Sequence, residues 1–140
     1  MQRVLIIDDQ AYVRAAVIAA LRVNGFEGVA VNDGIAGLRA FQESKFDLVI
    51  VDVYLPGMDG IKVIRELRAR APNQPIIAIS GVQLGLSERT ALDILPNARG
   101  MARIACLKKP FRPPELMAAI HSAMTLSAGS EAEAKAGAGA

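Results

Sequence analysis

The sequence has no tryptophan, one cysteine and one histidine, and aromatic residues make up only 4% of its 140 residues. A single cysteine cannot form an internal disulfide, which fits a reducing compartment. Cys106 and His121 are also too few for a zinc site, which needs three or four nitrogen, sulfur or carboxylate ligands in a recognisable spacing. With so few aromatic side chains, the core must be built mainly from aliphatic ones.

Excess charge and long apolar runs are also lacking. The net charge of +2 is too small to indicate binding to nucleic acid or to a membrane surface. The longest unbroken apolar stretch, residues 15–21, is far too short to span a bilayer. The first apolar run, residues 4–7, is interrupted by Asp8 and Asp9 and does not resemble a signal peptide. We therefore expect a soluble cytoplasmic protein that contacts neither nucleic acid nor a membrane directly.

Short apolar runs alternate with segments of helical spacing along the chain. The runs that we expect to be strands cover residues 4–7, 28–31, 47–52, 76–80 and 103–107. The expected helices cover residues 12–23, 35–43, 60–70, 88–95 and 113–124. This alternation predicts one α/β domain over residues 1–126, a doubly wound five-stranded parallel sheet with helices on both faces. The Ala- and Gly-rich residues 127–140 predict a disordered tail.

Polar side chains stand at the ends of four of the predicted strands. They are Asp8 and Asp9, Asp52, Ser80 and Lys109. The carboxyl ends of parallel strands meet at one edge of the sheet, where ligand sites form, so we expect these residues to share one site. Alone, Asp52 would indicate only a turn cap. Asp59 is interpreted as a helix N-cap and Gly60 as a requirement of turn geometry.

This set of side chains suits phosphoryl transfer to a carboxylate. Clustered carboxylates repel one another unless positive charge lies among them. Lys109 supplies one positive charge, and a hard divalent cation such as Mg²⁺ would supply the rest. A carboxylate beside Mg²⁺ can attack a phosphoryl group and form an acyl phosphate. The cation, Lys109 and the Ser80 hydroxyl would then share the charge on the phosphoryl oxygens.

Over about residues 3–126, the chain resembles the receiver domains of two-component response regulators. The matching features are Asp8-Asp9, the segment from Asp52 through Pro56-Gly57 to Asp59-Gly60, Ile79-Ser80-Gly81, and Lys109-Pro110-Phe111. The resemblance implies a flavodoxin-like (βα)5 fold with Asp52 as phosphoacceptor. It implies Mg²⁺ ligation by Asp9, Asp52 and the backbone carbonyl of Tyr54, with Asp8 helping through water. It also implies phosphate contacts from Lys109 and from Ser80, whose hydroxyl moves on phosphorylation.

The resemblance implies a phosphorylation-dependent signalling switch in a phosphorelay. Such a domain is not an enzyme acting on a separate substrate, because it catalyses only its own phosphorylation and dephosphorylation. The phosphoryl donor would be a phosphohistidine on a sensor histidine kinase or a histidine phosphotransfer protein. No output segment is recognisable after Met124, so we expect output through a downstream protein that binds the fourth helix, fifth strand and fifth helix. A second copy of the chain, giving a homodimer, is a further candidate partner.

Two features depart from the family pattern. Three residues before Lys109, most receivers carry an aromatic ring that turns inward when the switch hydroxyl moves, whereas this chain has Cys106. We expect Cys106 to be a small buried hydrophobic residue. The segment between Ser80 and Lys109 is also several residues longer than is typical, and the extra residues fit best at residues 82–86, with residues 95–100 as an alternative that could share them. Ordering of residues 82–86 beside the phosphate is our hypothesis for what replaces the ring movement.

Three other functions are compatible with an α/β chain of this kind. A phosphatase of the haloacid dehalogenase type carries a second Asp two residues after its nucleophile, where this chain has Tyr54. A flavodoxin-like cofactor binder needs a phosphate-binding loop after the first strand, where Asp8 and Asp9 would repel phosphate. A degenerate receiver that serves as a constitutive docking module stays open as the alternative. Tyr54 and Val82 stand two residues beyond Asp52 and Ser80, and both have an apolar body that orients no water, so we also predict slow self-dephosphorylation of Asp52.

Overall fold

A computed structural model of the chain describes residues 1–55, 59–81 and 104–125. The elements in chain order are β1 (Arg3–Ile7), α1 (Ala11–Val23), β2 (Glu27–Val31), α2 (Gly34–Glu43), β3 (Leu48–Asp52), α3 (Gly60–Arg70), β4 (Ile76–Gly81), β5 (Ala105–Lys109) and a helix over residues 113–125. The five strands are parallel and form one sheet in the order β2-β1-β3-β4-β5. The predicted doubly wound α/β fold is therefore confirmed.

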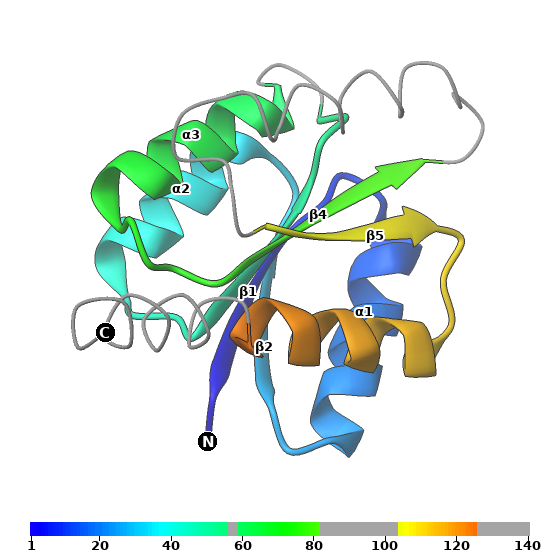
Figure 1. The fold of residues 1–140 in the computed structure, drawn as a ribbon. Coiled ribbons are helices and arrows are strands. Elements are labelled where there is room, and N and C mark those ends of the chain that lie inside the picture. Colours follow the sequence, from blue (N-terminus) through cyan, green and yellow to red (C-terminus); the bar gives the residue numbers. More distant parts are fainter. Residues whose placement is uncertain (56–58, 82–103, 126–140) are drawn as a thin grey trace, which may run out of the picture.

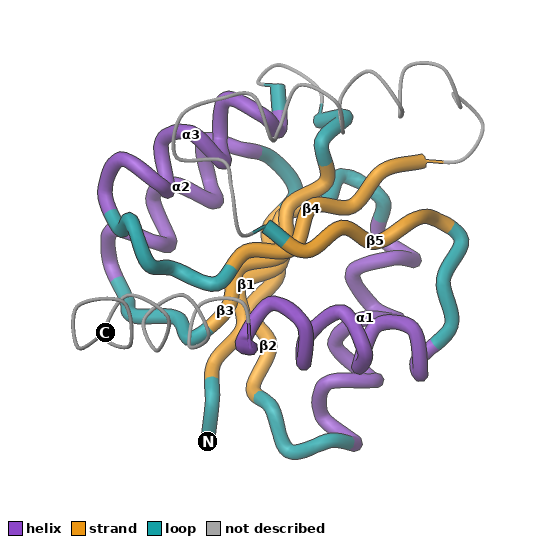
Figure 2. The backbone as a smooth tube through the Cα atoms, viewed as in Figure 1, coloured by secondary structure: helices purple, strands orange, loops and turns teal. Residues whose placement is uncertain are grey.

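The central strands β1, β3 and β4 are apolar except at their ends, because helices cover both faces of the sheet. Figures 1 and 2 show α2 and α3 on one face, and α1 with the helix of residues 113–125 on the other. In β1, Val4 and Ile6 belong to the core cluster on the α1 face, whereas Leu5 and Ile7 belong to the cluster on the α2–α3 face. All four side chains are fully buried. Two aliphatic layers, one on each face, thus fix the sheet whose edge carries the polar residues.

Local signals set the helix boundaries close to where the sequence predicts them. Asp33 caps α2, accepting a hydrogen bond from the Ala36 N–H at 2.7 Å. Asp59 caps α3 in the same way, through the Ile61 N–H at 2.8 Å, as predicted. Helix α1 is followed by Gly25 at φ +83°, a left-handed conformation that glycine adopts readily. The start of α3, just after the phosphoacceptor candidate, is therefore fixed by its own side-chain cap.

Strand β5 differs from the prediction in both its position and its burial. It covers Ala105–Lys109 rather than residues 103–107, so Lys109 is its last residue instead of following it. As the edge strand, it alternates between buried Ala105 and Leu107 and exposed Cys106 and Lys108. The prediction that Cys106 is a buried hydrophobic residue was therefore wrong. The reason is that side chains alternate between the two faces of a strand, a property called parity below. Because Ala105 and Leu107 face the core cluster that contains α1, Cys106 between them points the other way.

Gly60 is required by close packing and not, as expected, by turn geometry. It is the first residue of α3, and its N–H donates to the Val53 carbonyl at 3.2 Å. A Cβ atom at this position would overlap the carbonyl oxygen of Asp52 and lie 2.5 Å from the Val53 Cα. Helix α3 therefore begins directly against the backbone of Asp52, at a distance that only glycine permits.

Several predictions fall outside the described residues. They concern the fourth helix at residues 88–95, the segment 82–86 and the tail at residues 127–140. Within the described ranges, no helix is both long enough and apolar enough to cross a membrane.

Candidate functional site

The carboxyl edge of the sheet brings together residues from β1, β3 and β5. Asp8 directly follows β1, Asp52 ends β3 and Lys109 ends β5. The Nζ atom of Lys109 lies 2.9 Å from Oδ2 of Asp8 and 2.9 Å from Oδ2 of Asp52. The strand order reverses between β1 and β3, which is the crevice where open α/β sheets bind ligands. The convergence predicted for these three residues is thus present.

Backbone amides hold the other oxygen of each buried carboxylate. The Gln10 N–H donates to Oδ1 of Asp8 at 2.8 Å, and the Tyr54 N–H donates to Oδ1 of Asp52 at 2.9 Å. In addition, Nη1 of Arg14 donates to the backbone carbonyl of Asp8 at 2.8 Å. Each carboxylate is therefore oriented by the chain on one side and faces Lys109 on the other.

The site carries more negative than positive charge, and two of its carboxylates are buried. Asp8 is 0% exposed and Asp52 is 4% exposed. Burial raises the pKa of the Asp52 carboxyl above its ordinary value, although the hydrogen bonds from Lys109 and the Tyr54 backbone act to lower it. Burial alone would lower the pKa of Lys109, but its interactions with Asp52 and Asp8 raise it. One ammonium therefore does not fully compensate the carboxylates around it.

The donor set fits a hard divalent cation. One oxygen from each of Asp8, Asp9 and Asp52 lies within 4.8 Å of the others, with Asp9 exposed to solvent. The buried Oδ2 of Asp8 pairs with the Lys109 ammonium at 2.9 Å. A buried carboxylate oxygen that already pairs with a cation, beside two further carboxylates, suits Mg²⁺, which prefers oxygen ligands and retains several waters. Ligation by the Tyr54 carbonyl stays a prediction.

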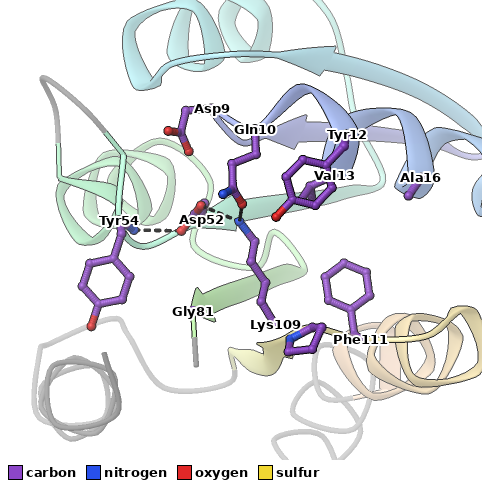
Figure 3. Close-up of a pocket in the computed structure, with 11 residues that line it drawn as sticks. Asp9, Gln10, Tyr12, Val13, Ala16, Asp52, Tyr54, Gly81, Lys109 and Phe111 are labelled. Atoms are coloured by element: carbon purple, nitrogen blue, oxygen red, sulfur yellow. Dashed lines mark hydrogen bonds and ion pairs between the residues drawn. The ribbon is translucent and has the colours of Figure 1, made fainter. Parts of the chain in front are cut away.

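A cavity of about 460 Å³ opens at this edge of the sheet. It is lined by Asp9, Gln10, Tyr12, Val13, Ala16, Asp52, Tyr54, Gly81, Lys109, Pro110 and Phe111. Figure 3 shows Gln10 and Asp52 turned towards the Lys109 ammonium, whereas the ring of Tyr54 points away from Asp52. The rings of Tyr12 and Phe111 lie on the far side of Lys109. The peptide bond from Lys109 to Pro110 is cis. The cavity thus has a charged floor at Asp52 and an apolar wall.

Ser80 is not among the residues that line this cavity. It is 2% exposed and has the same parity along β4 as Ala78, which packs in the core cluster on the α2–α3 face. Asp52 has the same parity along β3 as Ile50, which belongs to the other cluster. The hydroxyl and the carboxylate therefore start from opposite faces of the sheet, and the phosphate contact from Ser80 stays a prediction.

Gln10 is a site residue that the sequence reasoning missed. Its side-chain oxygen, Oε1, accepts a hydrogen bond from Nζ of Lys109 at 2.8 Å. Its position immediately after Asp8-Asp9 is a signal that could have drawn attention to it. Nothing in the sequence, however, gives the direction of a side chain at a helix N-cap.

Comparison with known proteins identifies the family. Residues 4–121 match the model of the response regulator receiver domain. The chain belongs to this family. The resemblance inferred from the strand-end residues is confirmed, and the chain is a receiver with the phosphorylation-dependent signalling role of that class.

Curated relatives of this receiver include longer regulators. It is 34% identical over 121 residues to the DNA-binding response regulator MtrA of Mycobacterium tuberculosis (strain ATCC 25618 / H37Rv), covering 86% of this chain and 50% of MtrA. It is 32% identical to the transcriptional regulatory protein PrrA of Mycobacterium bovis (strain ATCC BAA-935 / AF2122/97), covering 84% and 48%. The receiver therefore spans about half the length of these relatives.

Two solved structures match this chain over nearly their whole length. The chemotaxis protein CheY4 of Vibrio cholerae is 25% identical with a TM-score of 0.73, covering 86% of this chain and 97% of that one. The receiver domain of NtrX from Brucella abortus is 26% identical with a TM-score of 0.73, and covers the same shares of 86% and 97%. These likenesses confirm the flavodoxin-like receiver fold that the sequence predicts.

Proposed function

We propose that Asp52 of this receiver accepts a phosphoryl group from a phosphohistidine, with Mg²⁺ bound beside it. The observation that carries the proposal is the position of Asp52, which is buried, lines the cavity and receives a hydrogen bond from Lys109 at 2.9 Å. Asp8 is fully buried and is not among the lining residues, and Asp9 is exposed. Of the three carboxylates, Asp52 therefore combines access from the cavity with an ammonium at hydrogen-bonding distance.

In the proposed reaction, an Asp52 carboxylate oxygen forms a bond to phosphorus while the bond from phosphorus to the histidine nitrogen breaks. The electron pair of that bond returns to the imidazole, which takes up a proton from solvent, and Asp52 becomes an acyl phosphate. Lys109 would stabilise the charge that spreads over the phosphoryl oxygens. Bound Mg²⁺ would be held by Asp8, Asp9 and Asp52 and would supply further positive charge there.

The residues that line the cavity support a protein as the phosphoryl donor. Its apolar wall contains Tyr12, which is 70% exposed, together with Val13 and Phe111. An exposed aromatic ring beside a charged floor suits a partner that presents both an apolar surface and a phosphorylated side chain. We therefore place the donor, a histidine kinase or a histidine phosphotransfer protein, against α1 and the segment after β5.

The downstream partner is proposed at the β5 edge of the sheet. Exposed Cys106 and Lys108 lie there on the face away from α1, and the helix of residues 113–125 flanks the same strand on the α1 face. The fourth helix, which completes the predicted partner surface, lies outside the described residues. MtrA is named a DNA-binding regulator, but the net charge of +2 gives no independent support for DNA binding by this chain.

The test is incubation with a small phosphodonor and Mg²⁺, followed by intact mass spectrometry. The wild type should gain one phosphoryl group, and Asp52→Asn should gain none. Asp47→Asn, which changes an exposed carboxylate near the opposite end of β3, serves as the matched control and should be phosphorylated like the wild type. An adduct that persists in Asp52→Asn would show that another carboxylate is the acceptor. A wild type that never gains a phosphoryl group would favour the docking-module alternative.

A further inference from the structure

Gln10 contacts Lys109 but takes no part in the phosphoryl transfer proposed for Asp52. The Lys109 ammonium lies 2.9 Å from oxygens of Asp8 and Asp52 and 2.8 Å from Oε1 of Gln10. Asp8 and Asp52 offer it charged carboxylate oxygens, whereas Gln10 offers an amide oxygen. Of these three partners among the described residues, the amide oxygen is the uncharged one.

A divalent cation competes with Lys109 for two of these three oxygens. The backbone amides of Gln10 and Tyr54 already hold the Oδ1 atoms, so the Oδ2 atoms that face Lys109 are the more available metal ligands. Mg²⁺ and an ammonium on the same oxygens repel each other, and Mg²⁺ prefers carboxylates to amide oxygens in such small sites. The contact with Gln10 is therefore the one that a metal bound at the Oδ2 atoms would leave in place.

Without that contact, Lys109 has room to leave the site. Its ammonium is a compact charge on a flexible four-carbon stem, and it borders the cavity of about 460 Å³. Gln10 is the N-cap of α1 and its backbone N–H binds Oδ1 of Asp8, so its side chain starts from a fixed point that does not depend on the Oδ2 atoms. We propose that Gln10 is a positioning residue that keeps the Lys109 ammonium beside Asp52 when a metal ion takes the carboxylate oxygens.

The proposal rests on the function proposed for Asp52, and Gln10→Ala tests it with little structural disturbance. Although Gln10 is the N-cap of α1, its side chain makes no capping hydrogen bond within the described structure. The backbone N–H that binds Asp8 is retained in the variant. Gln10→Glu keeps an acceptor oxygen at the same reach and serves as the rescuing variant. Gln42→Ala, at an exposed position on α2, is the matched control.

The first measurement observes Lys109 directly, by NMR of ¹⁵N-labelled lysine ammonium groups in saturating Mg²⁺. The Lys109 signal is assigned by its loss in Lys109→Arg. In the wild type and in Gln42→Ala, hydrogen exchange with water should stay slow enough for the signal to be seen. In Gln10→Ala the signal should broaden through faster exchange, and Gln10→Glu should restore it. Equal exchange in the wild type and Gln10→Ala, or loss of the wild-type signal on adding Mg²⁺, would overturn the proposal.

The second measurement is the initial rate of phosphorylation by a small phosphodonor. Loss of a hydrogen bond to a charged group predicts a rate about tenfold lower in Gln10→Ala, with Mg²⁺ affinity retained and with recovery in Gln10→Glu. A Gln10→Ala rate equal to that of the wild type would also overturn the proposal. If the wild type itself accepts no phosphoryl group, the function proposed for Asp52 fails, while the NMR measurement still decides the role of Gln10.

Discussion

Replacing Lys109 by alanine should destabilise the fold by about 3 kcal/mol at pH 7 without Mg²⁺. The substitution leaves Asp8 and Asp52, 0% and 4% exposed, without the ammonium that lies between them. One oxygen of each lies within 4.8 Å of the other, and two charges at that distance repel by about 3 kcal/mol at an effective dielectric constant of about 20. Removing one partner of a buried ion pair typically costs a similar amount, about 3–5 kcal/mol.

The loss should shrink as the pH falls. Burial already raises the pKa of Asp52 in the folded receiver, and without the ammonium that pKa rises further. An acid with a raised folded pKa adds stability below its unfolded pKa and loses it as the pH rises through the folded pKa. The variant should therefore gain stability relative to the wild type from pH 7 down towards the ordinary Asp value of 3.8. At pH 7, added Mg²⁺ should restore part of the lost free energy of unfolding, because its positive charge also offsets the repulsion between Asp8 and Asp52.

Urea denaturation followed by far-ultraviolet circular dichroism measures this effect, since the chain has no tryptophan for fluorescence. Lys108→Ala is the matched control, because Lys108 is the preceding residue of β5 and is exposed. Its free energy of unfolding should stay within about 0.5 kcal/mol of the wild type. Equal losses in the two variants, or a Lys109→Ala loss that does not change with pH, would refute the electrostatic argument.

Three further predictions concern the same edge of the sheet. Gly60→Ala should lower the free energy of unfolding in urea by about 1–3 kcal/mol, because its Cβ overlaps the Asp52 carbonyl; unchanged stability would contradict the packing argument. Calorimetry should show Mg²⁺ binding weakening as the pH falls from 7 to about 5, because the raised pKa of Asp52 lets protons compete; constant affinity would contradict this. Phosphorylated Asp52 should hydrolyse slowly, because the Tyr54 ring points away from it; a half-life of seconds, followed by mass spectrometry, would contradict this.

The sheet could be predicted from sequence because β1, β3 and β4 are buried on both faces and are therefore apolar except at their ends. Strand β5 could not be placed as well, since only alternate residues of this edge strand are buried. The exposure of Cys106 follows from that parity, which the sequence shows only once the strand boundary is known. Gly60 was misinterpreted for a related reason, because its role depends on the approach of α3 to Asp52.

Predictions for the site likewise depend on whether strand topology or side-chain direction decides the position of a group. Asp8, Asp52 and Lys109 could be expected together because strand topology alone brings their backbones to one edge. The contact from Gln10 depends on a side-chain direction at the start of α1, which no periodic pattern encodes. Ser80 ends the expected strand, yet its parity places it on the face opposite to Asp52. Topology thus predicts which residues come near one another, whereas side-chain direction needs the structure.

The groups bound to the two buried carboxylates differ in how easily another group could replace them. Backbone amides bind the Oδ1 atoms of Asp8 and Asp52, and these amides cannot move without moving a strand end. The Oδ2 atoms face Lys109, whose flexible stem can follow a new charge at little cost. On the proposed function, a metal ion or a phosphoryl group at Oδ2 would displace the ammonium from that atom, while the backbone bonds at Oδ1 and the contact with Gln10 persist. We therefore expect the charge at Asp52 to change while the sheet edge stays intact, with Lys109 shifting within the site.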